Sequence, residues 1–238
     1  MKFHLYYACV ADKVTTRGTL FRIANNLFNC NNTVIFTTIM EPTSHKERRQ
    51  REITALRADI FRVVREIARD KGWEGVSMRK ICTAIQYTAP VIYEHFPKGK
   101  KQILSELRDQ GFDQFKTVLR DAATQAGPNP VDQLAAMAEA AWHFAVHEQD
   151  LYTVMFNLEG VKAPAEHQSA LRFAGEPVMD AIRALHKLEV DRDHWFFSWW
   201  AIVHGHAAIA LTGMASGVMP KFRTYVREAA ERLALAIR

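Results

Sequence analysis

A short polar segment carries the side chains best suited to binding a charged partner. Residues 76–96 read VSMRKICTAIQYTAPVIYEHF and combine guanidinium, ammonium, hydroxyl and phenol groups. Lys, Arg, Thr and Tyr are residues that commonly donate hydrogen bonds to phosphate oxygens. Arg79, Thr88 and Tyr93 are therefore candidate phosphate ligands, whereas packing beneath Phe96 is the alternative for Tyr93 and for His95.

Two short helices must position these groups. Ser77 can cap a helix that runs to about Ala84, and Thr88 can cap a second helix, which tolerates Pro90 in its first turn. Apolar residues at helical spacing mark the buried faces: Met78, Ile81 and Ile85 on the first helix, and Val91 or Ile92 with Phe96 on the second. The outward side of the second helix then carries Thr88, Ala89, Pro90 and Tyr93. With a long helix before it, this pair forms the helix-turn-helix arrangement, whose second helix enters the DNA major groove.

The rest of the chain also follows a helical pattern. One helix runs from about residue 45 to Lys71-Gly72, and further helices are expected at 100–124, 131–147, 151–158, 166–188 (with a kink at Gly175-Pro177), 191–214 and 220–238. Alternating strand patterns and glycine-rich phosphate loops are absent from the sequence. We therefore expect an all-α protein of about nine helices, with an N-terminal three-helix head and a C-terminal helical domain.

The segment 76–96 resembles the DNA-binding head of TetR-family transcriptional regulators. The resemblance covers about residues 50–105 and rests on the residues Ser77, Ile81, Ala84, Tyr87, Ile92, Tyr93, Glu94, His95 and Phe96. It implies that Tyr93 and a lysine, matched best by Lys100, contact the DNA backbone. It also places groove reading on Thr88, Ala89, Pro90 and Val91.

Two positions depart from the family pattern. Gln86 stands where the turn usually has glycine, so we expect a turn made without glycine's freedom at positive φ. The stretch 96–101 is one residue longer than usual, which leaves the phosphate-contacting lysine open among Lys98, Lys100 and Lys101. The alternative for these lysines is a solvated loop, but phosphate neutralisation dominates DNA affinity and favours contact by at least one of them.

A second resemblance lies near the C-terminus. Trp199, His204 and Gly205 are similar to the Trp…His-Gly signature of one group of TetR-family effector domains. In that family the last two long helices form a four-helix bundle with their copies in a second subunit. This implies a homodimer, for which we expect interface positions at Ala208, Leu211 and Tyr225. It also accounts for the absence of Asp, Glu, Lys and Arg from 195–220, for which a membrane span is the alternative.

Aromatic residues and methionines in the C-terminal domain are suited to an apolar ligand pocket. The candidate lining residues are Trp142, Phe156, Met179, Trp199 and His204, for which plain core packing is the alternative. Glu139, His143 and His147 share a helical face at four-residue spacing, but a fourth metal ligand cannot be named. We expect no metal, no cofactor and no catalytic residue.

Composition and charge fit a globular protein with a basic head. The 238 residues are 48% hydrophobic and 24% charged. Residues 41–120 carry 17 Lys/Arg against 11 Asp/Glu, whereas residues 121–238 carry 10 against 14, which suggests a polyanion-binding head on an acidic body. Cys9, Cys30 and Cys82 form no disulfide framework, which indicates a reducing, cytoplasmic setting.

The first residues read unlike the remainder. Residues 1–39 are rich in Asn and Thr, and Met40 is a plausible start. We expect 1–44 to be a disordered extension or an over-extended reading frame, with a small β-like segment at 33–39 as the alternative. The expected domains are then 45–98 for DNA binding and 99–238 for effector binding and dimerisation.

Taken together, the sequence predicts a homodimeric, ligand-responsive transcriptional repressor. Its partners would be double-stranded DNA with a palindromic operator and a small apolar or amphipathic effector, with no membrane. The alternative is an α-helical enzyme or ligand carrier whose basic head is incidental.

Overall fold

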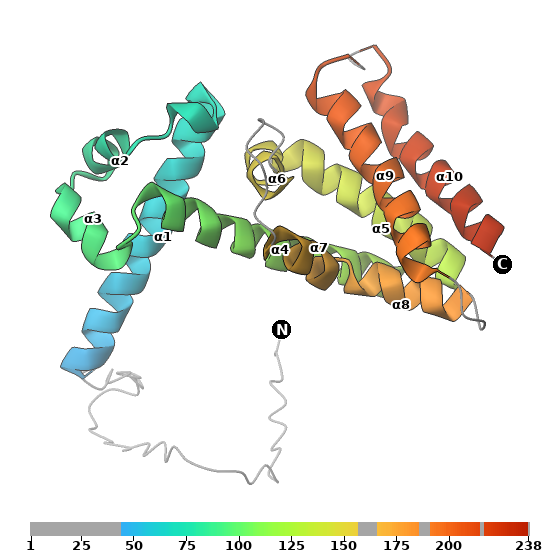
Figure 1. Cartoon of the computed structure of the whole chain (residues 1–238), viewed down its shortest axis with the longest axis horizontal. Coiled ribbons are helices and arrows are strands. Elements are labelled where there is room, and N and C mark those ends of the chain that lie inside the picture. Colours follow the sequence, from blue (N-terminus) through green and yellow to red (C-terminus); the bar gives the residue numbers. More distant parts are fainter. Residues whose placement is uncertain (1–43, 157–165, 186–190, 215–216, 238) are drawn as a thin grey trace, which may run out of the picture. The chain divides into compact units, whose positions relative to one another are not determined.

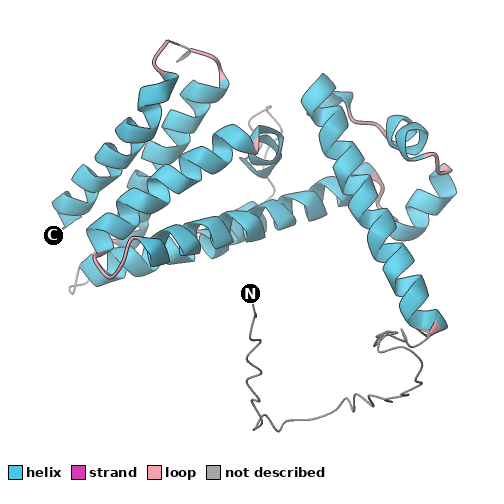
Figure 2. Ribbon diagram, turned by 180° about the vertical axis from the view of Figure 1, so that it is seen from behind, coloured by secondary structure: helices cyan, strands magenta, loops and turns pink. Residues whose placement is uncertain are grey.

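Every regular element in the described part of the chain is a helix. The computed structural model describes residues 44–156, 166–185, 191–214 and 217–237 (Figures 1 and 2). They form α1 (His45–Lys71), the 3₁₀ helix η1 (Trp73–Gly75), α2 (Met78–Ile85), α3 (Ala89–His95), α4 (Lys100–Gln125), α5 (Pro130–His147), α6 (Gln149–Phe156), α7 (Glu166–Ala174), α8 (Glu176–Leu185), α9 (Arg192–Leu211) and α10 (Met219–Ile237). The predicted all-α fold is confirmed. The expectations for 1–39 and for a β-like segment at 33–39 lie outside the described residues.

The head is built from α1, η1, α2 and α3. A capping box of Ser44 and Glu47 starts α1, and Gly72 ends it with a φ of 68°. The α1 residues that face the short helices include Ile60, Phe61 and Val64, all buried. This confirms the predicted long helix that precedes and supports the helix-turn-helix pair.

Arg57 of α1 ties the end of α3 to α4. Its guanidinium lies 4.2 Å from the centroid of the Phe96 ring, and its Nη1 donates to the carbonyl of His95 at 2.7 Å. The same guanidinium is paired with Glu106 of α4. Because the guanidinium binds partners at the end of α3 and on α4, it holds both elements against α1.

The body consists of α4 to α10, with α5 packed against α4 on one side and α10 on the other (Figure 2). Two glycines permit close approaches in this domain. A Cβ at Gly111 of α4 would lie 2.7 Å from Met155 Sδ of α6, and a Cβ at Gly175 would overlap the Phe196 ring. Any larger side chain at either position would push the neighbouring element away.

The single helix expected at 166–188 is two helices, which raises the number of α-helices to ten in the described residues. Gly175 separates α7 from α8 where the chain passes against Phe196. Pro177 lies in the first turn of α8 and has no N–H to continue the hydrogen-bond ladder of α7. The expected kink is therefore a full break.

The helix α9 is apolar on nearly all sides. Its inward residues Phe196, Trp199, Val203 and Ala207 are buried in the body. Its outward residues Phe197 and Ile209 remain 46% and 44% exposed. None of the described helices has the length and apolar character needed to span a bilayer.

A buried ionic cluster joins the head to the body. The Asp150 side chain, at the start of α6, is only 5% exposed and accepts hydrogen bonds from Arg65 Nε at 2.6 Å and Arg69 Nε at 3.1 Å. Arg65 is also paired with Glu148, and the indole N–H of Trp73 donates to the Asp150 carbonyl at 3.1 Å. Three residues of the head thus converge on one residue of the body.

We expect Asp150→Asn to destabilise the protein by about 3 kcal/mol, because it removes the buried carboxylate that binds Arg65 and Arg69 and leaves them only the more exposed Glu148. Asp180→Asn is the matched control, since Asp180 pairs with Arg183 on the surface of α8 and should cost less than about 1 kcal/mol. Denaturant unfolding measures both changes. If both variants lowered the free energy of unfolding by the same small amount, the buried cluster would not stabilise the protein.

The same cluster sets a dependence on pH. Burial opposes ionisation of Asp150, but hydrogen bonds from Arg65 and Arg69 outweigh it and lower the pKa of the carboxyl. A lowered folded pKa contributes stability that is fully present above the unfolded pKa of about 3.9 and is lost as the pH falls through the folded value. As the pH is lowered from 6, the free energy of unfolding should therefore fall more steeply for the native protein than for Asp150→Asn. Denaturant unfolding at a series of pH values measures both.

Candidate DNA-binding surface and effector site

The turn between α2 and α3 is made by a residue in the left-handed region. Gln86 has φ 57° and ψ 34°, and its N–H bonds to the carbonyl of Cys82. The turn is made without glycine, and Gln86 itself adopts the left-handed conformation that glycine usually supplies. Ser77 caps α2 as predicted, with its Oγ accepting from the N–H of Lys80.

The helix α3 buries one side and exposes the other. Ile92 and Phe96 are fully buried, so Ile92, rather than Val91, is the anchor. Thr88 stands at the N-cap position but makes no side-chain capping bond, which leaves its hydroxyl outside the helix. On the outer side, Thr88, Ala89 and Pro90 are exposed, Val91 is half-buried and Tyr93 is 46% exposed.

A loop after α3 brings Tyr93 close to the start of α4. Gly99 has φ 57° and ψ −140°, and a Cβ there would lie 3.0 Å from Cε1 of Tyr93. The Tyr93 ring therefore lies over the glycine, with its phenol oxygen 3.4 Å from the position of that Cβ. His95 is half-buried, and its carbonyl is held by Arg57.

The three loop lysines differ in what their ammonium groups contact. Lys100 Nζ donates to the carbonyls of Val76 at 2.6 Å and Trp73 at 3.2 Å. Lys98 and Lys101 are exposed, as is Arg79 on α2. The geometry favours Lys98 and Lys101 over Lys100 as phosphate ligands, because Lys100 already serves the main chain of the head.

The body holds a partly buried polar pair within an aromatic cluster. The hydroxyl of Tyr152 on α6 lies 3.0 Å from Nδ1 of His204 on α9. Burial raises the pKa of Tyr152 and lowers the pKa of His204. At neutral pH the pair is thus an uncharged phenol and an uncharged imidazole, which suits recognition of a polar group inside an apolar site.

Aromatic rings surround this pair. Phe156 lies 4.6 Å from Tyr152, 4.8 Å from Trp200 and 5.5 Å from His204, measured between ring centroids. Phe112 and Phe115 of α4 complete what we call the aromatic cluster: Phe112, Phe115, Tyr152, Phe156, Trp200 and His204. Phe156, Trp200 and His204 are each partly exposed.

The predicted ligand residues are only partly brought together. Phe156 and His204 meet in the aromatic cluster, whereas Trp199 is buried and donates its Nε1 to the carbonyl of Leu134 at 3.0 Å. Trp142 is buried on α5 with an indole N–H that has no partner in the described residues, and Met179 is half-buried on α8. The sequence pattern did not single out Tyr152 and Trp200; the four-residue spacing of Tyr152 and Phe156 could have indicated a shared face.

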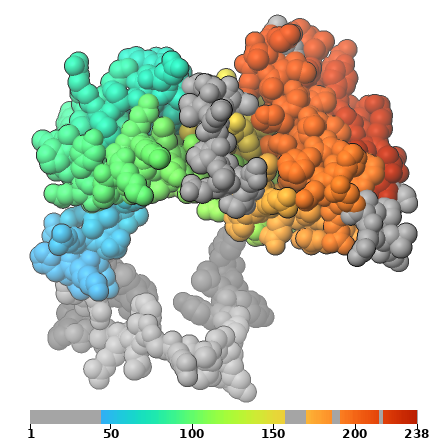
Figure 3. All heavy atoms as spheres, in the orientation of Figure 1, coloured from blue at the N-terminus to red at the C-terminus, as the bar shows by residue number. Residues whose placement is uncertain are grey.

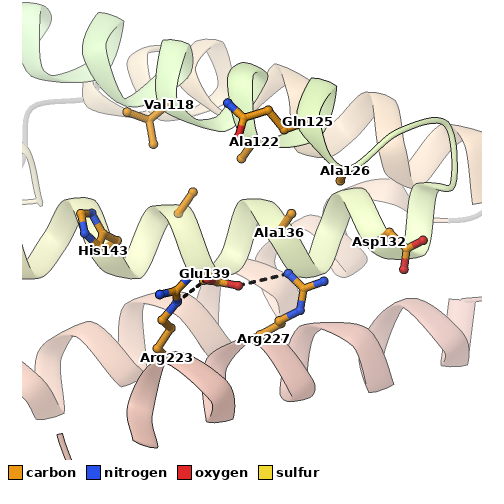
Figure 4. Close-up of a pocket in the computed structure, with 11 residues that line it drawn as sticks. Val118, Ala122, Gln125, Ala126, Asp132, Ala136, Glu139, His143, Arg223 and Arg227 are labelled. Carbon is orange, nitrogen blue, oxygen red and sulfur yellow. Dashed lines mark hydrogen bonds and ion pairs between the residues drawn. The ribbon is translucent and has the colours of Figure 1, made fainter. Parts of the chain in front are cut away.

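A separate groove lies between α4, α5 and α10 (Figure 4). Its walls are small residues such as Ala122, Ala136 and Ala140, and Glu139 stands between Arg223 and Arg227. The Glu139 carboxylate is therefore paired with two guanidiniums. His147 Nδ1 is bonded to the carbonyl of His143, and the two imidazoles stack at 3.8 Å, so the three candidate metal ligands do not converge.

The arrangement defines a class of protein. A three-helix head presents the outer side of α3, and a helical body holds a polar pair among aromatic rings, as in helix-turn-helix regulators that carry a ligand-binding domain.

Comparison with known proteins gives the family. Residues 60–107 match the profile of bacterial regulatory proteins of the tetR family, and residues 134–236 match the tetracyclin repressor-like C-terminal domain. The chain belongs to the TetR family, and it is a DNA-binding transcriptional regulator of the ligand-responsive type. TetR-family regulators are generally not enzymes. No curated protein sequence matches the chain.

Solved structures share the fold. The regulatory protein SCO4313 is 22% identical with a TM-score of 0.65, covering 79% of this chain and 98% of its own. A tetR-family transcription regulator from Shewanella sp. PV-4 is 14% identical with a TM-score of 0.57, covering 75% and 95%. Thermus thermophilus FadR, in complex with lauroyl-CoA, is 20% identical with a TM-score of 0.51, covering 75% and 93%.

We expect Gln86→Gly to stabilise the head by about 0.5–1 kcal/mol, because a left-handed conformation is costly for a residue with a Cβ and free for glycine. Ala55→Gly, at an exposed site within α1, is the control and should destabilise by a similar amount. Thermal unfolding measures both. A lower melting temperature for Gln86→Gly would mean that the glutamine side chain stabilises the turn.

Proposed function

We propose that this chain is a homodimeric repressor that a small apolar or amphipathic effector releases from a palindromic operator. The observation that supports this most is the buried ionic cluster of Asp150, because it links α1 of the head to α6, which carries Tyr152 of the aromatic cluster. A ligand that displaces α6 would act on the head through the same contacts.

The proposed DNA contacts lie on the exposed side of α3 and its flanking loop. Thr88, Ala89, Pro90 and Val91 would meet base edges, while phosphate would be bound by Arg79, Tyr93, Lys98 and Lys101. His95 lies at the end of α3 and would help to position that helix. In a two-fold dimer the two α3 helices would lie about 34–36 Å apart to reach successive major grooves.

The proposed effector site is the aromatic cluster. Apolar rings from α4, α6 and α9 would bind the body of the effector, and the uncharged Tyr152–His204 pair would orient one polar group. The related fold of Thermus thermophilus FadR was determined with lauroyl-CoA, an amphipathic ligand. Trp142, whose indole N–H has no partner among the described residues, and Met179 would lie outside the residues that contact the effector directly.

The proposed dimer interface is the outward stripe of α9. Phe197, Ala201, Gly205 and Ile209 recur at four-residue spacing and are exposed, and α9 lies at the surface of the body (Figure 3). A Cβ added at Gly205 meets nothing within 4 Å, so a second helix has room to approach there. Ala208 and the exposed Tyr225 of α10 would border this stripe, whereas Leu211 packs against the core of its own chain.

As a cytoplasmic, homodimeric repressor, the protein would bind chromosomal DNA directly. Selection of binding sites from a random DNA pool tests this function, since an inverted repeat should be enriched. The proposed function would be contradicted if no sequence were enriched and DNA binding did not depend on the salt concentration.

We expect Lys98→Ala combined with Lys101→Ala to weaken binding to every DNA sequence alike. The slope of log K against log salt should flatten by about one unit for each phosphate that the protein no longer neutralises. Fluorescence anisotropy with an operator fragment measures the slope.

Two controls separate this effect from others. Lys100→Met should lower the melting temperature and leave the slope unchanged, because the Lys100 ammonium binds main-chain carbonyls. Lys221→Ala, on the exposed side of α10, should change neither. A flattened slope for Lys100→Met alone would reassign the phosphate contact to Lys100.

We expect Ile209→Glu to give monomers or aggregates and to abolish operator binding while leaving the head intact. In a two-fold interface the same charge would face its own copy without water. Ala184→Glu, at an exposed site on α8, is the control and should remain dimeric. Sedimentation measures both variants, and a normal dimer for Ile209→Glu would place the interface elsewhere.

A further inference from the structure

Arg108 of α4 is a half-buried cation with no acidic partner in the described part of the chain. Its Nε donates to the carbonyl of Val154 on α6 at 3.1 Å, and no carboxylate within the described residues lies at ion-pair distance. Burial lowers the pKa of Arg108, and the charge of Asp109 offsets this only in part. The guanidinium still retains donors on its two Nη atoms, which have no acceptor among the described residues.

The other arginines of the described chain, and the buried Lys116, differ from Arg108. The half-buried arginines Arg57, Arg65 and Arg227 are paired with Glu106, Asp150 and Glu139. The buried Lys116, two turns after Arg108 on α4, is paired with Glu176. Arginines without a carboxylate partner are otherwise exposed, namely Arg49, Arg51, Arg79, Arg120 and Arg192. A half-buried guanidinium without an anion is costly, and among the described arginines only Arg108 carries that cost.

Arg108 adjoins the aromatic cluster on both of the helices that it contacts. On α4 it precedes Phe112 by one turn on the same face, and on α6 its acceptor Val154 is two residues from Phe156. Gly111, between them, permits the close packing of α4 on α6. The guanidinium therefore marks the end of the aromatic cluster that is nearer to the head.

We propose that Arg108 binds the anionic group of the effector, and that the effector is accordingly an amphipathic organic anion. This inference rests on the proposed function, because it names the chemical class of ligand for the same site. The apolar body of the ligand would lie against Phe156 and Trp200, and its anionic end would accept hydrogen bonds from the Arg108 Nη atoms. A carboxylate or a phosphate would meet this requirement, and the experiment distinguishes them.

The groove of Figure 4 is a weaker site for such an anion. Its two arginines, Arg223 and Arg227, already share the carboxylate of Glu139. An incoming anion would have to displace that carboxylate, whereas at Arg108 it would compensate an existing charge.

The test uses the full-length protein and matched ligand pairs. Decanoate is compared with decanol, naphthoate with naphthalenemethanol, and decyl phosphate with both aliphatic ligands, by calorimetry. We expect the anion of each pair to bind about tenfold to a hundredfold more tightly than its alcohol, as for hydrogen bonds between charged groups. If decanoate binds more tightly than decyl phosphate, the effector is a carboxylate. If decyl phosphate binds more tightly, the effector is a phosphate ester.

Variants then assign the preference to one residue. Arg108→Gln should bind anion and alcohol alike and keep the affinity for the alcohol, Arg108→Lys should retain part of the preference, and Arg120→Gln on the exposed side of α4 should retain all of it. Thermal unfolding checks that the variants are folded. The proposal is overturned if no anion binds, if anion and alcohol bind native protein equally, or if Arg108→Gln keeps the preference. Operator binding by ligand-free protein is measured separately, so failure of the regulator function itself would be recognised.

Discussion

The carboxylate of Asp150 is the contact on which the connection between head and body depends. It is almost fully buried, and its charge is stabilised only because Arg65 and Arg69 of α1 donate to it. Two residues later the same helix presents the Tyr152 hydroxyl to His204. The position of the DNA-binding head and the geometry of the polar pair are therefore both set in the first turn of one short helix, and a movement of that turn would affect both.

A second connection runs through α4. Its first residue, Lys100, holds the carbonyls of Trp73 and Val76, and Glu106 holds Arg57 beside the end of α3. Two residues after Glu106, Arg108 reaches Val154 of α6. Polar groups of α4 thus bind groups of the head and of the body in turn, and so hold the loop after α3, α3 itself and the aromatic cluster in defined relative positions.

Local signals in the sequence predicted much of the fold. Ser77, Gly72 and the apolar spacing of Ile60, Val64 and Ile81 define helices that the structure contains. Contacts between distant residues could not be predicted, because nothing in a periodic pattern specifies them. The Tyr152–His204 pair spans 52 residues and the Arg65–Asp150 pair spans 85. The turn at Gln86 could not be predicted either, because tertiary packing can impose a left-handed conformation on a residue that disfavours it.

The close approach at Gly111 makes α4 a lever with its pivot inside the body. Gly111 lies three turns from Lys100 along the helix, a rise of about 16 Å. A tilt of about 5° about this point would move the N-terminal end of α4 by about 1.5 Å, which is comparable to half the length of a hydrogen bond. Because Gly111 leaves no space for a Cβ against Met155, a small displacement of α6 transmits directly to that pivot. Adding one methyl group at Gly111 would therefore push α4 away from α6 and change the relation between the two domains.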